Sequence, residues 1–177
     1  MRRSDDPRDR RAPRWLLALV AVVAILVPSG TALADVSTKY AILGAEVWAT
    51  PTVGTFVGGA NGSSGDVASW AARIEHTVQT QPGGKITGGW ATLYTSELTR
   101  IHGRFSHGTL RLVDDGGSNC GDLRHIVKAR LVDVTRSDSD VVGTGRLEAV
   151  LIHYRVEILG TCLAYSASVS GTITFSF

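Results

Sequence analysis

LAYSASVSGTITFSF, residues 163–177, is the stretch that decides the fold, because apolar side chains recur at every second position of it. Successive side chains of an extended chain point to opposite sides, so this alternation predicts a strand with one buried face. The opposite face holds small or polar residues, mostly serine and threonine. The predicted inward positions are Leu163, Tyr165, Ala167, Val169, Gly171, Ile173, Phe175 and Phe177.

The same period of two recurs earlier in the chain, whereas helical periodicity is absent from residues 35–177. Residues 69–80 place Trp70, Ala72, Ile74, His76 and Val78 on one face, and residues 123–131 do so with Leu123, His125, Val127, Ala129 and Leu131. Further strands are predicted over residues 40–48, 52–57, 85–94, 100–105, 109–113 and 141–159. The last of these is long enough to need a bend or a bulge.

Segments rich in glycine, aspartate and serine separate these strands, at residues 58–66, 81–84, 114–119 and 136–140. Roughly nine short strands with such spacing predict an all-β domain over residues 35–177. We favour an antiparallel β-barrel of lipocalin or allene-oxide-cyclase size, because closure removes the unpaired edge of the last strand. A β-sandwich is the alternative. Gly88-Gly89-Trp90 spells the G-x-W of lipocalins, but it lies too far along the chain to assign a family.

Residues 1–34 have the three parts of a cleavable secretory signal peptide. An arginine-rich start is followed by the uncharged run WLLALVAVVAILV (residues 15–27), and Ala32-Leu33-Ala34 supplies small residues for cleavage. The apolar run is shorter than the ~20 residues that span a bilayer. We therefore expect a secreted, extracellular or cell-envelope protein whose membrane contact is limited to the uncleaved signal.

Removal of the signal changes the charge of the chain. The signal holds six arginines and three aspartates, so the net charge of +2 falls to −1 in the mature part. Single charges are scattered along the strands, and no basic stripe suggests a nucleic-acid partner. We expect no cofactor and no metal, and the sequence does not indicate an oligomeric state.

Cys120 and Cys162 are the only cysteines, and both lie in the mature part. An even number of cysteines in an exported protein predicts a disulfide. Two free thiols or a metal site are the alternatives, although a metal site needs more ligands at close spacing.

The candidate binding residues are aromatic side chains and histidines that the alternation directs inward: Trp70, His76, Trp90, His125 and Tyr165. A barrel of about eight strands can enclose one small ligand. Two imidazoles inside it can bind a polar group or transfer protons near neutral pH. Ordinary core packing is the competing interpretation for all five residues. His102 and His153 are expected on polar faces.

The leading hypothesis is a secreted β-barrel module that binds a small, partly apolar ligand. One alternative is an envelope-associated interaction or structural protein with a solid core, acting through its loops. A second is an isomerase or cyclase that uses the barrel lumen, although no catalytic motif supports it and we expect binding rather than catalysis. A third is an outer-membrane barrel, suggested by the terminal phenylalanine after a long alternating strand.

Overall fold

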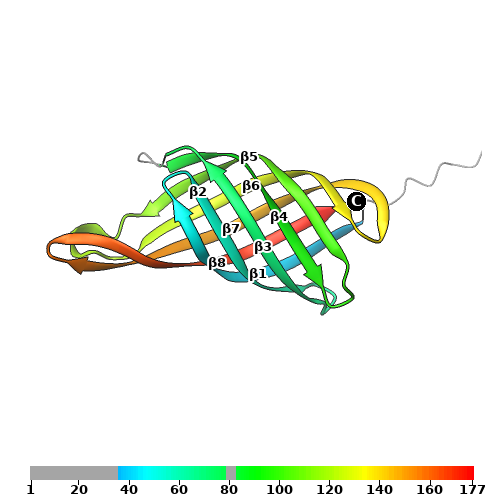
Figure 1. Cartoon of the computed structure of the whole chain (residues 1–177), viewed down its shortest axis with the longest axis horizontal. Helices are drawn as coiled ribbons and strands as arrows, with labels where there is room; N and C mark the ends of the chain where they lie inside the picture. The colour runs from blue at the N-terminus through cyan, green and yellow to red at the C-terminus, as the bar shows by residue number, and fades with distance from the viewer. Residues whose placement is uncertain (1–35, 79–82) are drawn as a thin grey trace, which may run out of the picture. The chain divides into compact units, whose positions relative to one another are not determined.

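The computed structural model describes residues 36–78 and 83–177, which form eight β-strands and one short 3-10 helix (Figure 1). In residues 36–78 and 83–177, no helix is long and apolar enough to cross a lipid bilayer. The predicted signal, residues 1–34, lies outside the described residues. The strands are β1 (Ser37–Thr50), β2 (Val53–Gly62), β3 (Val67–His76), β4 (Gly83–Thr95), β5 (Arg100–Asp114), β6 (Leu123–Arg136), β7 (Ser139–Ile158) and β8 (Thr161–Ser176), and the helix η1 spans Gly117–Asn119.

The strands form a closed antiparallel barrel in chain order. Each strand pairs with the next, and β8 returns to β1 with Tyr40 opposite Ile173. This confirms the predicted barrel over the alternative sandwich. Closure gives every strand a paired neighbour on both sides within the barrel, so the barrel wall has no open edge.

The structure has eight strands instead of the nine predicted, because one pair of predicted strands is continuous. Residues 100–105 and 109–113 belong to one strand, β5, whose pairing with β6 is interrupted by bulges at residues 102–104 and 105–107. The glycine-rich segment 58–66 was predicted as a loop, yet residues 58–62 belong to β2 and glycine there allows close strand packing. Of the predicted turn at 81–84, Gly83 and Gly84 start β4, and residues 81–82 lie outside the described residues.

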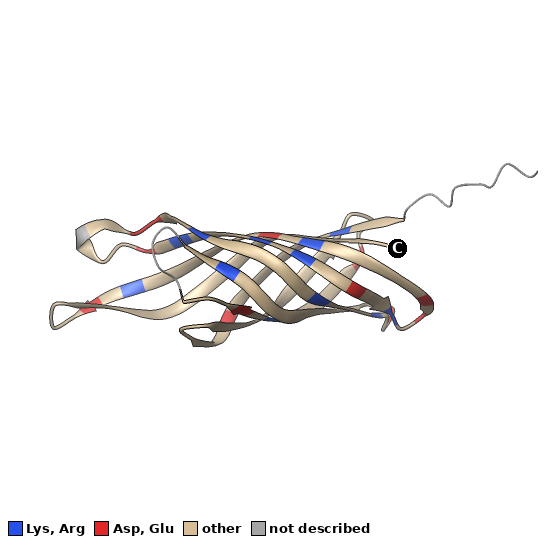
Figure 2. Ribbon diagram, turned by 90° about the horizontal axis from the view of Figure 1, so that it is seen from above, with Lys and Arg blue, Asp and Glu red and all other residues tan. Residues whose placement is uncertain are grey.

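The barrel interior is apolar and its outer surface carries the charges. Twenty-five buried hydrophobic residues form one core cluster that draws on all eight strands. Outward positions between them hold exposed cations and anions, among them Arg104, Lys128, Arg146 and Glu148, and Lys and Arg recur along the strands in Figure 2. The alternation in the sequence therefore corresponds to inside and outside of one closed sheet.

The two ends of the barrel are packed differently. The end at which β1 starts and β8 ends is filled by large side chains, with Tyr40, Leu93, Leu131 and Phe175 each at most 3% exposed. The other end is formed by the β1–β2, β3–β4, β5–β6 and β7–β8 connections. At the filled end the rings of Tyr40 and Phe175 pack edge to face, with centroids 6.4 Å apart.

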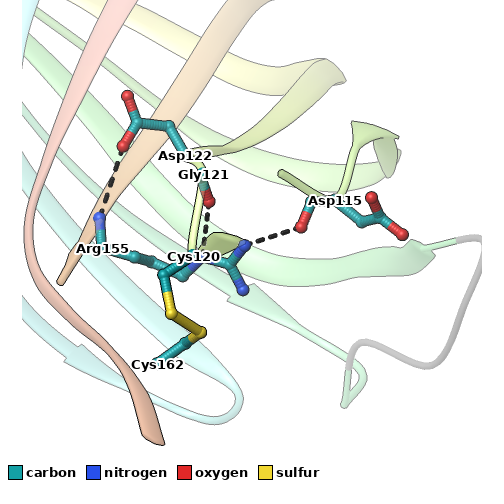
Figure 3. Close-up of a disulfide and its surroundings, with 6 residues drawn as sticks. All are labelled: Asp115, Cys120, Gly121, Asp122, Arg155 and Cys162. Atoms are coloured by element: carbon teal, nitrogen blue, oxygen red, sulfur yellow. Dashed lines mark hydrogen bonds between the residues drawn. A yellow bond between two sulfur atoms is a disulfide. The ribbon is translucent and has the colours of Figure 1, made fainter. Parts of the chain in front are cut away.

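At the connection-rich end, β7 and β8 extend beyond their neighbours as a hairpin that a disulfide ties to the β5–β6 loop (Figures 1 and 3). The predicted Cys120–Cys162 disulfide is formed, with a Cα–Cα distance of 5.4 Å. Arg155 of β7 adds two charge-assisted hydrogen bonds to the same loop, from Nε to the Gly121 carbonyl (2.7 Å) and from Nη2 to the Asp115 carbonyl (2.7 Å). The hairpin turns at Leu159 and Gly160, which both have the positive φ of a type I′ turn.

Candidate functional site

A cavity of about 310 Å³ lies inside the barrel at the connection-rich end. It reaches the surface, because several of its lining residues are exposed, such as Thr50 and Pro51 of the β1–β2 connection. Its volume is at the lower end of the range of about 300–1,000 Å³ that is typical of small-molecule sites. Most of its wall is apolar and comes from β2, β3, β5, β6 and β7: Phe56, Ile74, Leu110, Leu123, Val127 and Leu151.

Four ionisable side chains interrupt this apolar wall: Glu46 of β1, His76 of β3, His125 of β6 and His153 of β7. His153 Nε2 lies 3.2 Å from Glu46 Oε2, and these side chains are only 18% and 10% exposed. The rings of His125 and His153 meet edge to face, with centroids 5.4 Å apart. The site therefore combines a carboxylate–imidazole pair with a second imidazole in contact with it.

A glycine leaves the space that the Glu46 carboxylate occupies. Gly54 lies on β2 next to β1, and a Cβ atom there would lie 2.6 Å from Glu46 Oε1 and 2.8 Å from the Phe56 ring. Any larger residue at position 54 would have to displace the carboxylate. The absence of a side chain at Gly54, which also lines the cavity, thus leaves room for the Glu46 carboxylate.

His125 is the most deeply buried of the four side chains, at 2% exposed. Burial, and after it the neighbouring His153 and His76, together lower its pKa from 6.5 to about 4. His125 is therefore neutral at pH 7. Its Nδ1 and that of His153 are buried without a hydrogen-bond partner, a situation that costs about 1–3 kcal/mol per group.

His76 is held by a backbone hydrogen bond, in which its Nδ1 donates to the Thr77 carbonyl at 2.8 Å. A carbonyl can only accept, so the proton of a neutral His76 is on Nδ1 and its Nε2 is an acceptor. Within the described part of the chain, no three His, Cys, Asp or Glu side chains are arranged to hold a metal ion. Imidazole and carboxylate groups such as these can form hydrogen bonds and transfer protons.

The structure brings together only two of the five predicted binding residues. His76 and His125 line the cavity, as the alternation of their strands predicts. Trp70 is directed inward too, but it is packed in the core at 4% exposure, and its Nε1 donates to the Leu43 carbonyl at 3.1 Å. Trp70, Trp90 and Tyr165 are not among the described lining residues. A binding role for any of the five residues stays a prediction.

Two bulges explain why Trp90 and Tyr165 lie elsewhere. In β4 the pairing with β3 shifts before Trp90, so Trp90 faces outward beside His102, with ring centroids 6.3 Å apart. In β8 the register shift opposite Tyr154 and Arg155 skips Tyr165, which is 68% exposed and stacks near Tyr154. A bulge adds one unpaired residue and reverses the faces beyond it.

Glu46 and His153 were missed as site residues. His153 was expected on a polar face, yet it follows Leu147, Ala149 and Leu151 on the inward face of β7. The outward positions Val150 and Ile152 are also apolar, which hides the alternation of this strand. Glu46 is separated from the buried Tyr40 and Ile42 by an even number of positions, so all three lie on the same face of β1. This spacing could have predicted its inward position.

The fold and the cavity define a small up-and-down β-barrel with a hollow, histidine-lined end. Comparisons with protein-family models, with curated proteins and with solved structures found no match for the chain. Its function therefore has to be argued from the site.

Proposed function

We propose that the mature domain binds a small, partly apolar molecule in the cavity at the connection-rich end of the barrel. The observation that carries the proposal is the cavity itself, about 310 Å³ with an apolar wall and four ionisable groups. An apolar wall supplies binding free energy through burial, and a few polar groups orient the ligand. A barrel with a solid core, as in the structural alternative, would have no such space.

We further propose that the protein is exported. The N-terminal arginine-rich and apolar segments support export, and the Cys120–Cys162 disulfide fits an extracellular compartment. The alternative of an outer-membrane barrel is less well supported than an exported binding domain. Exposed charged residues such as Lys128 and Arg146 lie on the outer face, where a transmembrane barrel carries an apolar band, and the interior is apolar where such barrels are polar.

Filling the cavity tests the proposal. We expect the fluorescent apolar amine N-phenyl-1-naphthylamine to bind the mature protein, and the Ala164→Trp variant to bind it about tenfold more weakly, a loss of ~1.4 kcal/mol. Ala164 lines the cavity at its exposed edge, so a larger side chain there competes with the ligand. Fluorescence titration measures both affinities.

The matched control is Ala41→Trp, which adds the same side chain at an exposed position of β1 that is not among the described lining residues. This variant should bind the probe as the wild type does. Equal affinity of the Ala164→Trp and wild-type proteins, or no probe binding at all, would contradict a binding site in this cavity.

A second candidate function is acid–base catalysis in the barrel lumen, as in an isomerase or cyclase. The observation that favours it is the Glu46–His153 pair. A carboxylate beside Nε2 favours a proton on that nitrogen and makes Nδ1 of the same ring a better base. A base of this kind would remove a proton from the carbon next to a carbonyl group.

Deuterium exchange distinguishes carrier from catalyst. The bicyclic ketone 2-tetralone is incubated with the protein in deuterated buffer, and exchange next to its carbonyl is followed by NMR. For a binding module we expect the exchange rate of buffer alone. An acceleration of about 100-fold, the lower range for general base catalysis, that is lost in His153→Gln would favour the enzyme.

A further inference from the structure

The polar atoms of the cavity carry information about the head group of the ligand, and the following inference rests on the proposed binding function. Glu46, His76, His125 and His153 come from four strands of the barrel, and no lysine or arginine occurs among the described lining residues. Glu46 is the one acidic side chain among these lining residues. An anionic head group placed here would meet a carboxylate and no lysine or arginine.

One short contact and one hydrogen bond decide which imidazole nitrogens remain as acceptors. His153 Nε2 lies 3.2 Å from Glu46 Oε2, and this carboxylate favours a proton on Nε2, so the Nδ1 atom of a neutral His153 has a free lone pair. His76 Nδ1 donates to the Thr77 carbonyl, so its Nε2 atom also has a free lone pair. Both rings therefore offer acceptors, and a ligand must bring a hydrogen-bond donor to use them.

His125 extends this requirement. Its ring contacts that of His153 and is neutral, with Nδ1 buried and unpartnered. A neutral imidazole has one N–H donor and one acceptor, and no hydrogen bond in the structure selects its tautomer. A hydroxyl group both donates and accepts, so it can donate to one imidazole and accept from the other, whereas an ammonium group can only donate.

We propose that the ligand is a small apolar alcohol or phenol, whose hydroxyl group donates to Nδ1 of His153 and accepts a hydrogen bond from His125, while its apolar body lies against Phe56, Ile74 and Leu151. Carboxylates and phosphates of the same size are disfavoured by Glu46. The buried imidazoles are matched by this head group, and their unpartnered nitrogens become hydrogen-bonded on binding.

Matched naphthalenes test the head group at pH 7 in competition with N-phenyl-1-naphthylamine. We expect 2-naphthol to bind about tenfold more tightly than 2-methylnaphthalene, which has no donor, and about tenfold more tightly than 2-naphthoate, which is anionic. His153→Leu should bring the affinity for 2-naphthol down to that for 2-methylnaphthalene. His107→Leu is the control, because His107 is exposed and outside the described cavity lining, and it should leave all three affinities unchanged.

Glu46→Gln provides a second measurement, since it keeps the shape and removes the charge. It should narrow the preference for 2-naphthol over 2-naphthoate by about tenfold, and this arm decides the question if His153→Leu does not fold. Equal or tighter binding of 2-methylnaphthalene or 2-naphthoate would overturn the inference while the binding function stands. Failure of the fluorescent probe and of all three naphthalenes to bind would overturn the binding function as well, whereas binding of the probe alone overturns only the inference.

Discussion

Replacing both Cys120 and Cys162 with serine is expected to lower the free energy of unfolding of the mature domain by about 4 kcal/mol. The disulfide joins residues 42 positions apart, and the segment between them contains all of β6 and β7. Cross-linking so long a segment restricts the unfolded chain more than the folded one. For a domain of this size, the loss corresponds to a fall in Tm of roughly 10 °C.

Thermal and urea denaturation of the oxidised wild type and the double variant measure this effect. Reduction supplies the control, because a reducing agent should bring the wild type to the stability of the double variant and leave the variant unchanged. A difference below about 1 kcal/mol would mean that the bridge restrains only the protruding β7–β8 hairpin and the β5–β6 loop. In that case the Arg155 hydrogen bonds to Gly121 and Asp115 would hold these segments by themselves.

Acidification is expected to destabilise the protein through His125, by about 3 kcal/mol between pH 7 and pH 4. The folded protein holds the pKa of His125 at about 4, whereas an imidazole in the unfolded chain has a pKa near 6.5. Between these values the unfolded chain binds a proton that the folded one does not, so unfolding becomes easier as the pH falls. The contribution is fully present above pH ~6.5 and is lost toward pH 4.

The contribution of His125 is isolated by comparing wild type with His125→Leu in urea denaturation at several pH values. His76, His153 and Glu46 line the cavity together with His125, and they are present in both proteins. The variant should therefore show a flatter pH dependence, while His107→Leu, changed at an exposed site, should follow the wild type. Parallel curves for wild type and His125→Leu would refute the lowered pKa of His125. A titration of the His125 imidazole itself near pH 6.5 in NMR spectra would refute it as well.

Much of the barrel was predictable because the alternation of side chains is a local property of an extended chain. The inward positions Trp70, Ala72 and Ile74 follow from their own strand, as do His125 and Val127 from theirs. The disulfide was predictable for a different reason, since the mature chain offers only one pair of cysteines.

Bulges limited the same reasoning, because an unpaired residue leaves little trace in the sequence. The shift before Trp90 turns this side chain outward, and the shift at Tyr165 exposes a residue whose spacing matches Ala167 and Val169. Each bulge is a property of two paired strands, so it depends on register rather than on the composition of either strand.

By itself, the sequence determined the all-β class, the inward faces of the regularly alternating strands and the cysteine pair, because these depend on neighbouring residues or on counting. Tertiary structure alone decided which end of the barrel is hollow and which polar groups meet there. The hollow depends on the summed volumes of inward side chains from eight strands. Glu46 and His153 meet although β1 and β7 are not paired in the sheet, since closure of the barrel places them across the same lumen.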